Sequence, residues 1–141
     1  MTALAVGTPR RRRNDGDIKF ATYLMTASKT IYEGSLVCII ATTGLAEAAA
    51  DTSGFRCVGV STETKVSAAT GSFYITVAYG HEELFATGST LVGAVDVAVC
   101  VSDDNVVEVI GTTVNDVKVG PVKQAMSSTL AWIEIRGATP L

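Results

Sequence analysis

The residues that could perform acid–base or metal chemistry are few in this chain. His81 is the only histidine among 141 residues, and Glu82 and Glu83 follow it directly. Metal and catalytic sites gather groups from several elements, so this adjacent trio predicts a solvated turn after a strand. A Ser-His-Asp site would have to be built around His81 alone. We therefore expect no enzyme, no catalytic residue and no metal site.

Motifs that hold ions or cofactors are also missing from the sequence. Asp103-Asp104-Asn105 lacks the spacing and the distant glutamate of a calcium loop, and it is expected to form a hairpin turn. Neither a Gly-x-Gly-x-x-Gly run nor a Gly-Lys-Ser/Thr phosphate loop occurs. We expect no cofactor.

The three cysteines, Cys38, Cys57 and Cys100, lie inside apolar segments. An odd number without Cys-x-x-Cys spacing argues against a zinc site and against a complete disulfide framework. We interpret them as buried, reduced thiols that pack as small hydrophobic groups. This usage is typical of assembly in a compartment like the cytosol.

The charges divide the chain into a basic arm and an acidic body. Residues 1–20 hold five basic and two acidic side chains, whereas residues 21–141 hold six basic and twelve acidic ones. We expect residues 1–17 to form an extended basic arm and residues 18–141 to form a single β domain. Arginine binds carboxylates in a bidentate fork, so Arg10, Arg11, Arg12 and Arg13 are the candidate binding residues. Leu4 and Val6 would add apolar anchoring.

Composition predicts an all-β fold for the body. Val, Thr and Ile fill 44 positions, and charged residues make up only 18%. β-Branched residues favour strands over helices. We expect a compact β-barrel or β-sandwich-like domain. The longest unbroken apolar run, Leu36–Ala41, is far shorter than the roughly 20 residues that span a bilayer, so no membrane partner is expected.

Strand-like segments recur at short spacing along the body. Alternation is clearest at 72–79 and at 95–101, where Phe73, Ile75, Val77 and Tyr79, and then four valines, would share one inward face. Two short segments, 45–50 and 122–126, have the composition of one or two helical turns. The expected strands are 20–25, 35–40, 56–61, 72–79, 95–101, 106–110, 117–122 and 130–136.

A weak internal sequence repeat predicts two similar β units, although such short matches also arise by chance in strand-rich chains. Gly34–Val37 resembles 88–92, Val58–Val60 resembles 119–121, and Ile75–Gly80 resembles 133–137. The three pairs occur in the same order in both halves.

The same elements carry a family resemblance over about residues 20–137. After a basic arm come Gly34–Val37, a Phe-x-x-Val-Gly-Val strand and an alternating strand that ends in Gly80, then Asp-Asp-Asn-Val and a final Trp-Ile-Glu-Ile. This pattern resembles the small capsid cement, or head decoration, proteins of tailed bacteriophages. The resemblance implies a structural protein on the outer surface of the virion, made in the host cytoplasm. Its partner would be the major capsid protein, and it would form a homo-oligomer, with a trimer favoured.

Three alternatives stay open. A tail-tube or connector subunit would need a long loop or hairpin for ring stacking, and no segment clearly serves. A nucleic-acid-binding protein could use Arg10–Arg13 on phosphates, but the acidic body would repel a polyanion. A ligand-binding barrel would need polar groups on an inward face, where this sequence offers apolar ones.

Overall fold

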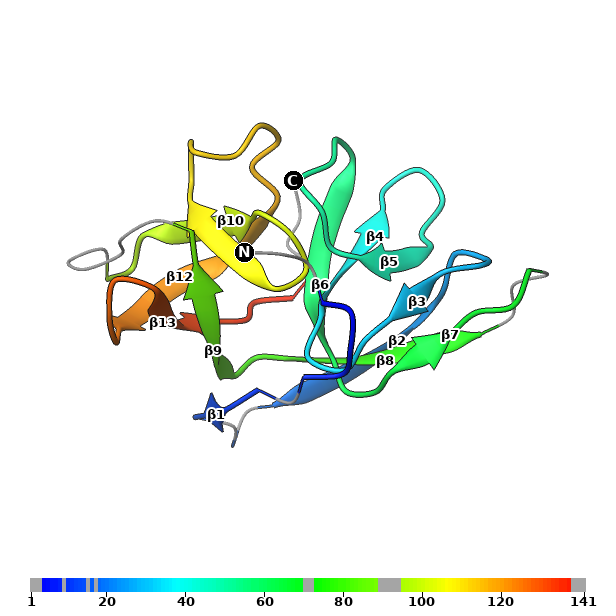
Figure 1. Cartoon of the computed structure of the whole chain (residues 1–141), viewed down its shortest axis with the longest axis horizontal. Helices are drawn as coiled ribbons and strands as arrows, with labels where there is room; N and C mark the ends of the chain where they lie inside the picture. Colours follow the sequence, from blue (N-terminus) through cyan, green and yellow to red (C-terminus); the bar gives the residue numbers. More distant parts are fainter. Residues whose placement is uncertain are drawn as a thin grey trace.

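A computed structural model describes residues 4–8, 10–14, 16, 18–69, 73–88 and 95–137, and confirms the all-β fold. No α-helix lies in these ranges. The chain forms two neighbouring β units, crossed by the N-terminal segment (Figure 1). The strands are β1 (Arg12–Arg13), β2 (Lys19–Leu24), β3 (Thr30–Ile31), β4 (Leu36–Ile40), β5 (Ala46–Ala48), β6 (Phe55–Ser61), β7 (Lys65–Val66), β8 (Tyr74–Tyr79), β9 (Glu82–Thr87), β10 (Ala98–Val101), β11 (Val106–Val109), β12 (Lys118–Ala125) and β13 (Leu130–Glu134).

The second half of the chain closes into a five-stranded barrel. Its order is β9-β11-β10-β12-β13, and β13 pairs back onto β9. All pairings are antiparallel except the one between β9 and β11. β1 adds to β9 on the same edge as β11 but at the opposite end of the strand. Closure removes free sheet edges from this half, apart from the short one that β1 covers.

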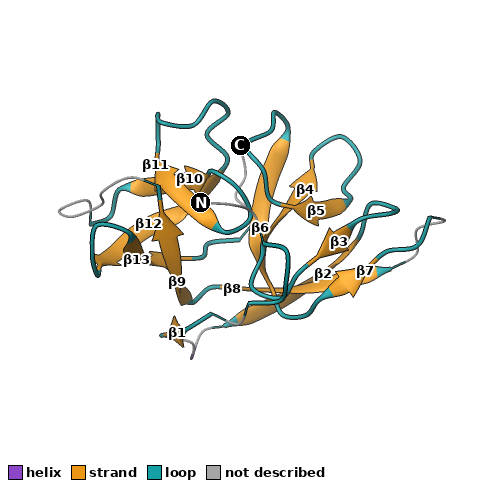
Figure 2. Ribbon diagram, viewed as in Figure 1, coloured by secondary structure: helices purple, strands orange, loops and turns teal. Residues whose placement is uncertain are grey.

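The first half repeats that strand order. Its sheet runs β2-β8-β6-β4-β5, and a parallel bridge from Met25 to Ala46 links the end of β2 to β5. Each strand of the first half has a counterpart in the second half: β2 corresponds to β9, β4 to β10, β5 to β11, β6 to β12 and β8 to β13. Figure 2 shows the two units as separate groups of strands joined through the long β6 and the β8–β9 connection. A small third sheet pairs β3 with β7.

Both halves carry the same irregularity at the same place. In the β4–β6 ladder the pairing register shifts after Val37, which lies opposite Gly59. In the β10–β12 ladder it shifts after Val99, which lies opposite Gly120. Bulges of this kind re-aim a strand and are specific features of a fold. Shared strand order and a shared bulge support the predicted pair of similar units.

One of the three predicted sequence matches was paired wrongly. Gly34 has φ 84° and precedes β4 by two residues, and Asp96 has φ 66° and precedes β10 by two residues. The structural counterpart of Gly34 is therefore Asp96 and not Gly88. Most of the segment 88–92 lies outside the described residues. The matches at Val58–Val60 and Ile75–Gly80 fall on β6 with β12 and on β8 with β13, as predicted.

The main core lies between the two units. Leu36, Cys57 and Val60 of the first half pack with Phe85, Ile133 and other residues of the second half, all nearly inaccessible to solvent. A second cluster around Met25, Ile31 and Ile75 belongs to the first half alone. The two units share their largest core, so they fold as one body.

Both predicted helical segments are wrong. Residues 46–48 form β5, and residues 122–126 lie in or just after β12. Neither segment is long enough to nucleate a helix alone, so strand pairing decides their conformation. The predicted inward face of four alternating valines is only partly correct. Val99 and Val101 are buried, whereas Val95 and Val97 precede β10 and are exposed. Phe73 likewise precedes β8 and is 40% exposed.

The predicted hairpin turn at Asp103-Asp104-Asn105 is confirmed. It joins β10 to β11, and Asp103 Oδ1 accepts the N–H groups of Asn105 and Val106 at 2.8 and 2.9 Å. This is the Asx arrangement by which aspartate stabilises tight turns.

Substitution of the bulge glycine Gly120 by Ala is expected to lower the free energy of unfolding by about 3 kcal/mol. A Cβ at this position would lie 1.9 Å from the carbonyl oxygen of Glu134, and backbone cannot move aside cheaply. The control is Gly16→Ala, because a Cβ there meets nothing within 4 Å. Chemical denaturation measures both, and equal stability of the two variants would contradict the close approach.

Candidate functional site

His81, Glu82 and Glu83, which sequence reasoning placed in a solvated turn, are buried at the start of β9. His81 is 1% exposed, Glu82 7% and Glu83 0%. The prediction was wrong because β9 is an integral barrel strand, so its first residues lie between β13 and β1. Only Gly80 and His81 separate β8 from β9, which leaves no length for a solvent-exposed turn.

Two arginines of the N-terminal segment neutralise these carboxylates. Arg12 Nε lies 2.7 Å from Glu83 Oε1, and Arg13 Nε lies 2.7 Å from Glu82 Oε1. The same residue pairs are register partners in the β1–β9 ladder. His81 Nε2 also lies 2.7 Å from Glu83 Oε1. Backbone pairing and side-chain charge thus fix the arm at one position on the barrel.

Further contacts hold Arg13 on the barrel surface. Its Nη1 donates to Gln124 Oε1 at 2.7 Å, and its guanidinium stacks 4.4 Å from the centre of the Trp132 ring. Asn14 Nδ2 donates to Glu82 Oε2. Ion pair, amide and aromatic face together restrain one arginine, a combination that suits its flat and delocalised cation.

Arg10 joins the two halves of the molecule. Its guanidinium lies 4.0 Å from the centre of the Phe85 ring, Nε donates to the carbonyl of Gly34, and Nη2 donates to Asn105 Oδ1 at 2.7 Å. Burial lowers the pKa of Arg10, while the nearby carboxylates of Glu83, Asp104 and Asp103 act in the opposite direction. The arginine stays charged because its ordinary pKa is far above neutrality.

Asp104 anchors the beginning of the arm. Its side chain is buried and accepts the Leu4 N–H at 2.9 Å and the Ser35 hydroxyl at 2.7 Å. This aspartate belongs to the turn that sequence analysis identified, but its contact with the arm carried no sequence signal.

The six predicted binding residues therefore fall into two groups. Leu4 is half-buried and held through its backbone, and the side chains of Arg10, Arg12 and Arg13 are committed to contacts within the chain. Val6 is 67% exposed, and the Arg11 side chain is also exposed. The Arg11 carbonyl accepts the Leu84 N–H at 3.1 Å, so its backbone is fixed while its side chain faces solvent.

Sequence reasoning missed Glu82 and Glu83 as the partners of the arm. The charge asymmetry between arm and body was the one available signal, and it could not say which acidic residues would meet the arginines. The ion pairs Arg12–Glu83 and Arg13–Glu82 hold the arm on β9, and we call them the clamp. Their cations and carboxylates are already paired. His81 Nδ1 and Glu83 Oε2 are buried without a hydrogen-bond partner among the described residues.

A shallow cleft of about 350 Å³ lies beside the arm. Arg10, Arg12 and Glu83 form one part of its wall, and Phe20 with Thr62 form another. Apart from Glu33, its charged groups are Arg10 and those of the clamp, so it extends the same surface.

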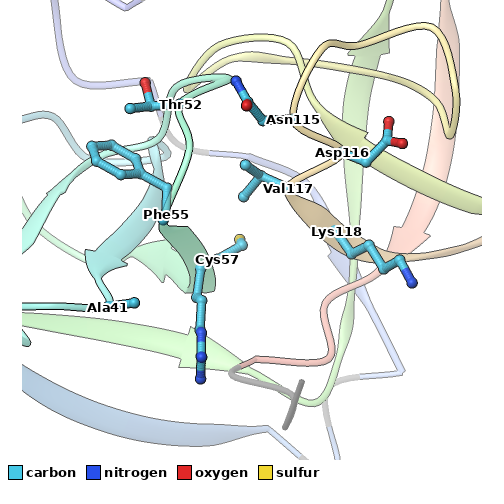
Figure 3. A pocket seen from close by; sticks show the side chains of 10 residues that line it. Ala41, Thr52, Phe55, Cys57, Asn115, Asp116, Val117 and Lys118 are labelled. Carbon is cyan, nitrogen blue, oxygen red and sulfur yellow. The ribbon is translucent and has the colours of Figure 1, made fainter.

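A larger pocket, of about 410 Å³, lies where the two halves meet. Phe55 and Cys57 of β6 line one side, and Asn115 and Val117, ahead of β12, line the other (Figure 3). Asp51 holds the opposing loop, because its carboxylate accepts the Val114 and Asn115 N–H groups at 2.8 Å each. The pocket is thus framed by a loop bonded across the two units.

All three cysteines are free and buried, as the sequence predicts. Burial raises the pKa of Cys100 to about 11, and the carboxylate of Asp116 adds to the shift. The Cys57 side chain and burial both raise the pKa of Cys38. Thiolates are the reactive form of cysteine, so these thiols are suited to packing.

Comparisons with known proteins add no family. No protein-family model matches this chain, and no curated protein is similar to it. In the described ranges, no three His, Cys, Asp or Glu side chains are grouped as a metal would require. The same ranges contain no helix with the length and hydropathy to cross a bilayer.

Replacement of Glu83 by Gln is expected to lower the free energy of unfolding by about 2 kcal/mol, because Arg12 and His81 both lose a buried anionic partner. Arg12 is one-third exposed, so water offsets part of the loss. The matched control is Glu134→Gln, which removes the 2.8 Å surface pair with Arg136 and should cost well under 1 kcal/mol. Urea denaturation of both variants checks the difference, and similar losses would contradict the clamp.

The native thiols are expected to resist an aromatic disulfide reagent at pH 8. With a pKa of about 11, roughly one Cys100 in a thousand is thiolate at that pH. Absorbance should rise only after guanidinium unfolds the chain, and then by three thiols per molecule. Rapid labelling of the folded protein would contradict the burial of the cysteines.

Proposed function

We propose that this protein is a structural component of a phage virion that binds the outside of the assembled capsid and stabilises it. It carries out no catalysis. The sequence resemblance to capsid cement proteins motivates the proposal, and the partner is the major capsid protein. The protein is made in the host cytoplasm and resides on the outer surface of the virion.

The observation that carries the proposal is the docked arm. The backbone from Arg11 to Arg13 is bonded to β9, while the Arg11 and Val6 side chains face solvent. A segment that is ordered before binding loses less conformational entropy when it meets a partner. An exposed cation and an exposed apolar side chain on the same segment suit a surface that offers both carboxylates and apolar groups.

The clamp also changes the role expected for the other arginines. Arg12 and Arg13 are neutralised within the chain, so they position the arm, and Arg10 braces it against Phe85. Direct pairing with capsid carboxylates then falls to Arg11. The same neutralisation leaves fewer cations for nucleic acid, which favours a protein partner over a polyanion.

The body supplies a rigid support for the arm. Two units with a common core resist deformation better than separate modules, because close-packed interiors are poorly compressible. The family resemblance implies a homo-oligomer, with a trimer favoured, and several weak contacts on a repeating lattice would then add avidity.

The double variant Val6→Asp, Arg11→Glu is expected to bind purified expanded capsids roughly tenfold more weakly, about 1.4 kcal/mol. Co-sedimentation measures the loss, and binding of the unmodified protein should weaken with added salt. Both side chains are exposed, so circular dichroism should be unchanged.

The matched control is Lys29→Glu, which makes the same change of charge as Arg11→Glu at an exposed position in the first half of the chain. It should bind capsids like the unmodified protein. Equal binding by the double variant and the control would contradict the role of the arm. Failure of the unmodified protein to bind any expanded capsid would contradict the proposed function itself.

A further inference from the structure

One edge of β2 has no partner among the described residues. The Met25 N–H donates to the carbonyl of Phe73, so the odd-numbered residues of β2 are bonded toward β8. The even-numbered residues, Phe20, Thr22 and Leu24, therefore direct their N–H and C=O groups away from β8. Thr26 follows this alternation, because its N–H reaches the carbonyl of Ala46 on the far side.

The second half shows how the equivalent edge is completed. There the backbone N–H and C=O groups of the even-numbered residues of β9 point away from β13. The Leu84 N–H donates to the carbonyl of Arg11 in the arm. The Gly88 N–H donates to β11 just as the Thr26 N–H donates to β5, which makes Thr22 the counterpart of Leu84. The edge that the arm covers on β9 is open on β2.

A second arginine segment does not fit the open edge. The counterparts of Glu82 and Glu83 on β2 are Phe20 and Ala21, so no carboxylate stands ready for a guanidinium. This edge therefore suits an extended strand that has neutral side chains opposite Phe20, Thr22 and Leu24.

The exposed face of β2 is unusually apolar for a free edge. Phe20 is 59% exposed, and Tyr74, the register partner of Leu24, is 54% exposed. Sheet edges in monomers are commonly protected by charges, proline or bulges. Between Phe20 and Leu24 the strand has none of these, and its regular six-residue ladder with β8 has no bulge.

We propose that this edge pairs with the same edge of a second copy of the chain, antiparallel and across a two-fold axis at Thr22. Thr22 then faces Thr22 of the second copy, and Phe20 faces Leu24 of the second copy. These are the residues whose backbone groups point outward, so both strands offer donors and acceptors in register. The two five-stranded sheets become one continuous sheet.

Side-chain chemistry favours antiparallel pairing of the two β2 strands over parallel pairing. In the antiparallel pair Phe20 of one copy lies opposite Leu24 of the other, and Tyr74 lies next to that Leu24 on the neighbouring strand, so the apolar groups form one row. The two Lys19 side chains are six positions apart, about 20 Å. A parallel pair would place Lys19 beside Lys19. The strand is therefore complementary to itself only when the copies run in opposite directions.

This contact is independent of the proposed capsid role. It uses the outward edge of β2, whereas the arm pairs through β1 with β9 and presents Val6 and Arg11 to solvent. An isologous contact makes a closed dimer, since each copy uses the same β2 edge. It therefore predicts a two-fold assembly in solution and not the trimer that the family resemblance implies.

The first experiment measures the mass of the full chain by analytical ultracentrifugation over a range of concentrations. We expect a dimer that Thr22→Pro weakens at least tenfold, because proline removes the outward N–H but leaves the bonds to β8 intact. The control is Thr22→Val, which keeps the N–H and should still form a dimer. A monomer or a trimer at the highest soluble concentration would overturn the proposal.

A charge exchange tests the register itself. Thr22→Lys and Thr22→Glu each place like charges opposite each other at the two-fold axis, so each variant alone should be mainly monomeric. An equimolar mixture should recover the dimer, because lysine then faces glutamate. Both variants are exposed substitutions on a free edge, so folding should be retained. Dimers of either variant alone, or no recovery on mixing, would overturn pairing at Thr22.

Discussion

A carboxylate buried at the start of β9 must be neutralised, and the N-terminal segment supplies the cation. Glu83 is fully buried because β9 closes the barrel, and an unpaired charge there would be costly. Arg12 pairs with it, and the β1–β9 ladder sets the two residues opposite each other. This ion pair and the ladder fix the middle of the arm on the barrel, with Arg10 stacked on Phe85 and the Arg11 side chain exposed.

The two halves share a strand order and a bulge but differ in how their equivalent edges are completed. Where β9 carries Glu82 and Glu83, β2 carries Phe20 and Ala21. This difference directs the basic segment to one half and leaves the other half with an apolar strand edge. A duplicated unit can acquire two distinct surfaces in this way without any change of fold, because the edge side chains do not decide strand order.

Local patterns in the sequence predict most of the strands but little of the site. Alternation and β-branched content are properties of short segments, so β6, β8 and β13 were found within a residue or two at most boundaries. β9 was missed because Glu82-Glu83 reads as polar surface, and its burial depends on partners about 70 residues away in the chain. The 45–50 segment was misassigned because three strand residues between turns give no alternation to read.

The same reasoning explains why all four arginines of the extended arm were expected to bind a partner. Four adjacent arginines repel one another in isolation, and a sequence shows that repulsion without the carboxylates that relieve it. In the folded chain alternate placement on β1 sends Arg12 and Arg13 to different carboxylates, while Arg10 stacks on an aromatic ring. Arg11 alone among the four keeps an exposed side chain with no ion pair to a described residue. The basic run therefore fixes the N-terminal segment on the barrel and leaves the Arg11 side chain exposed to solvent.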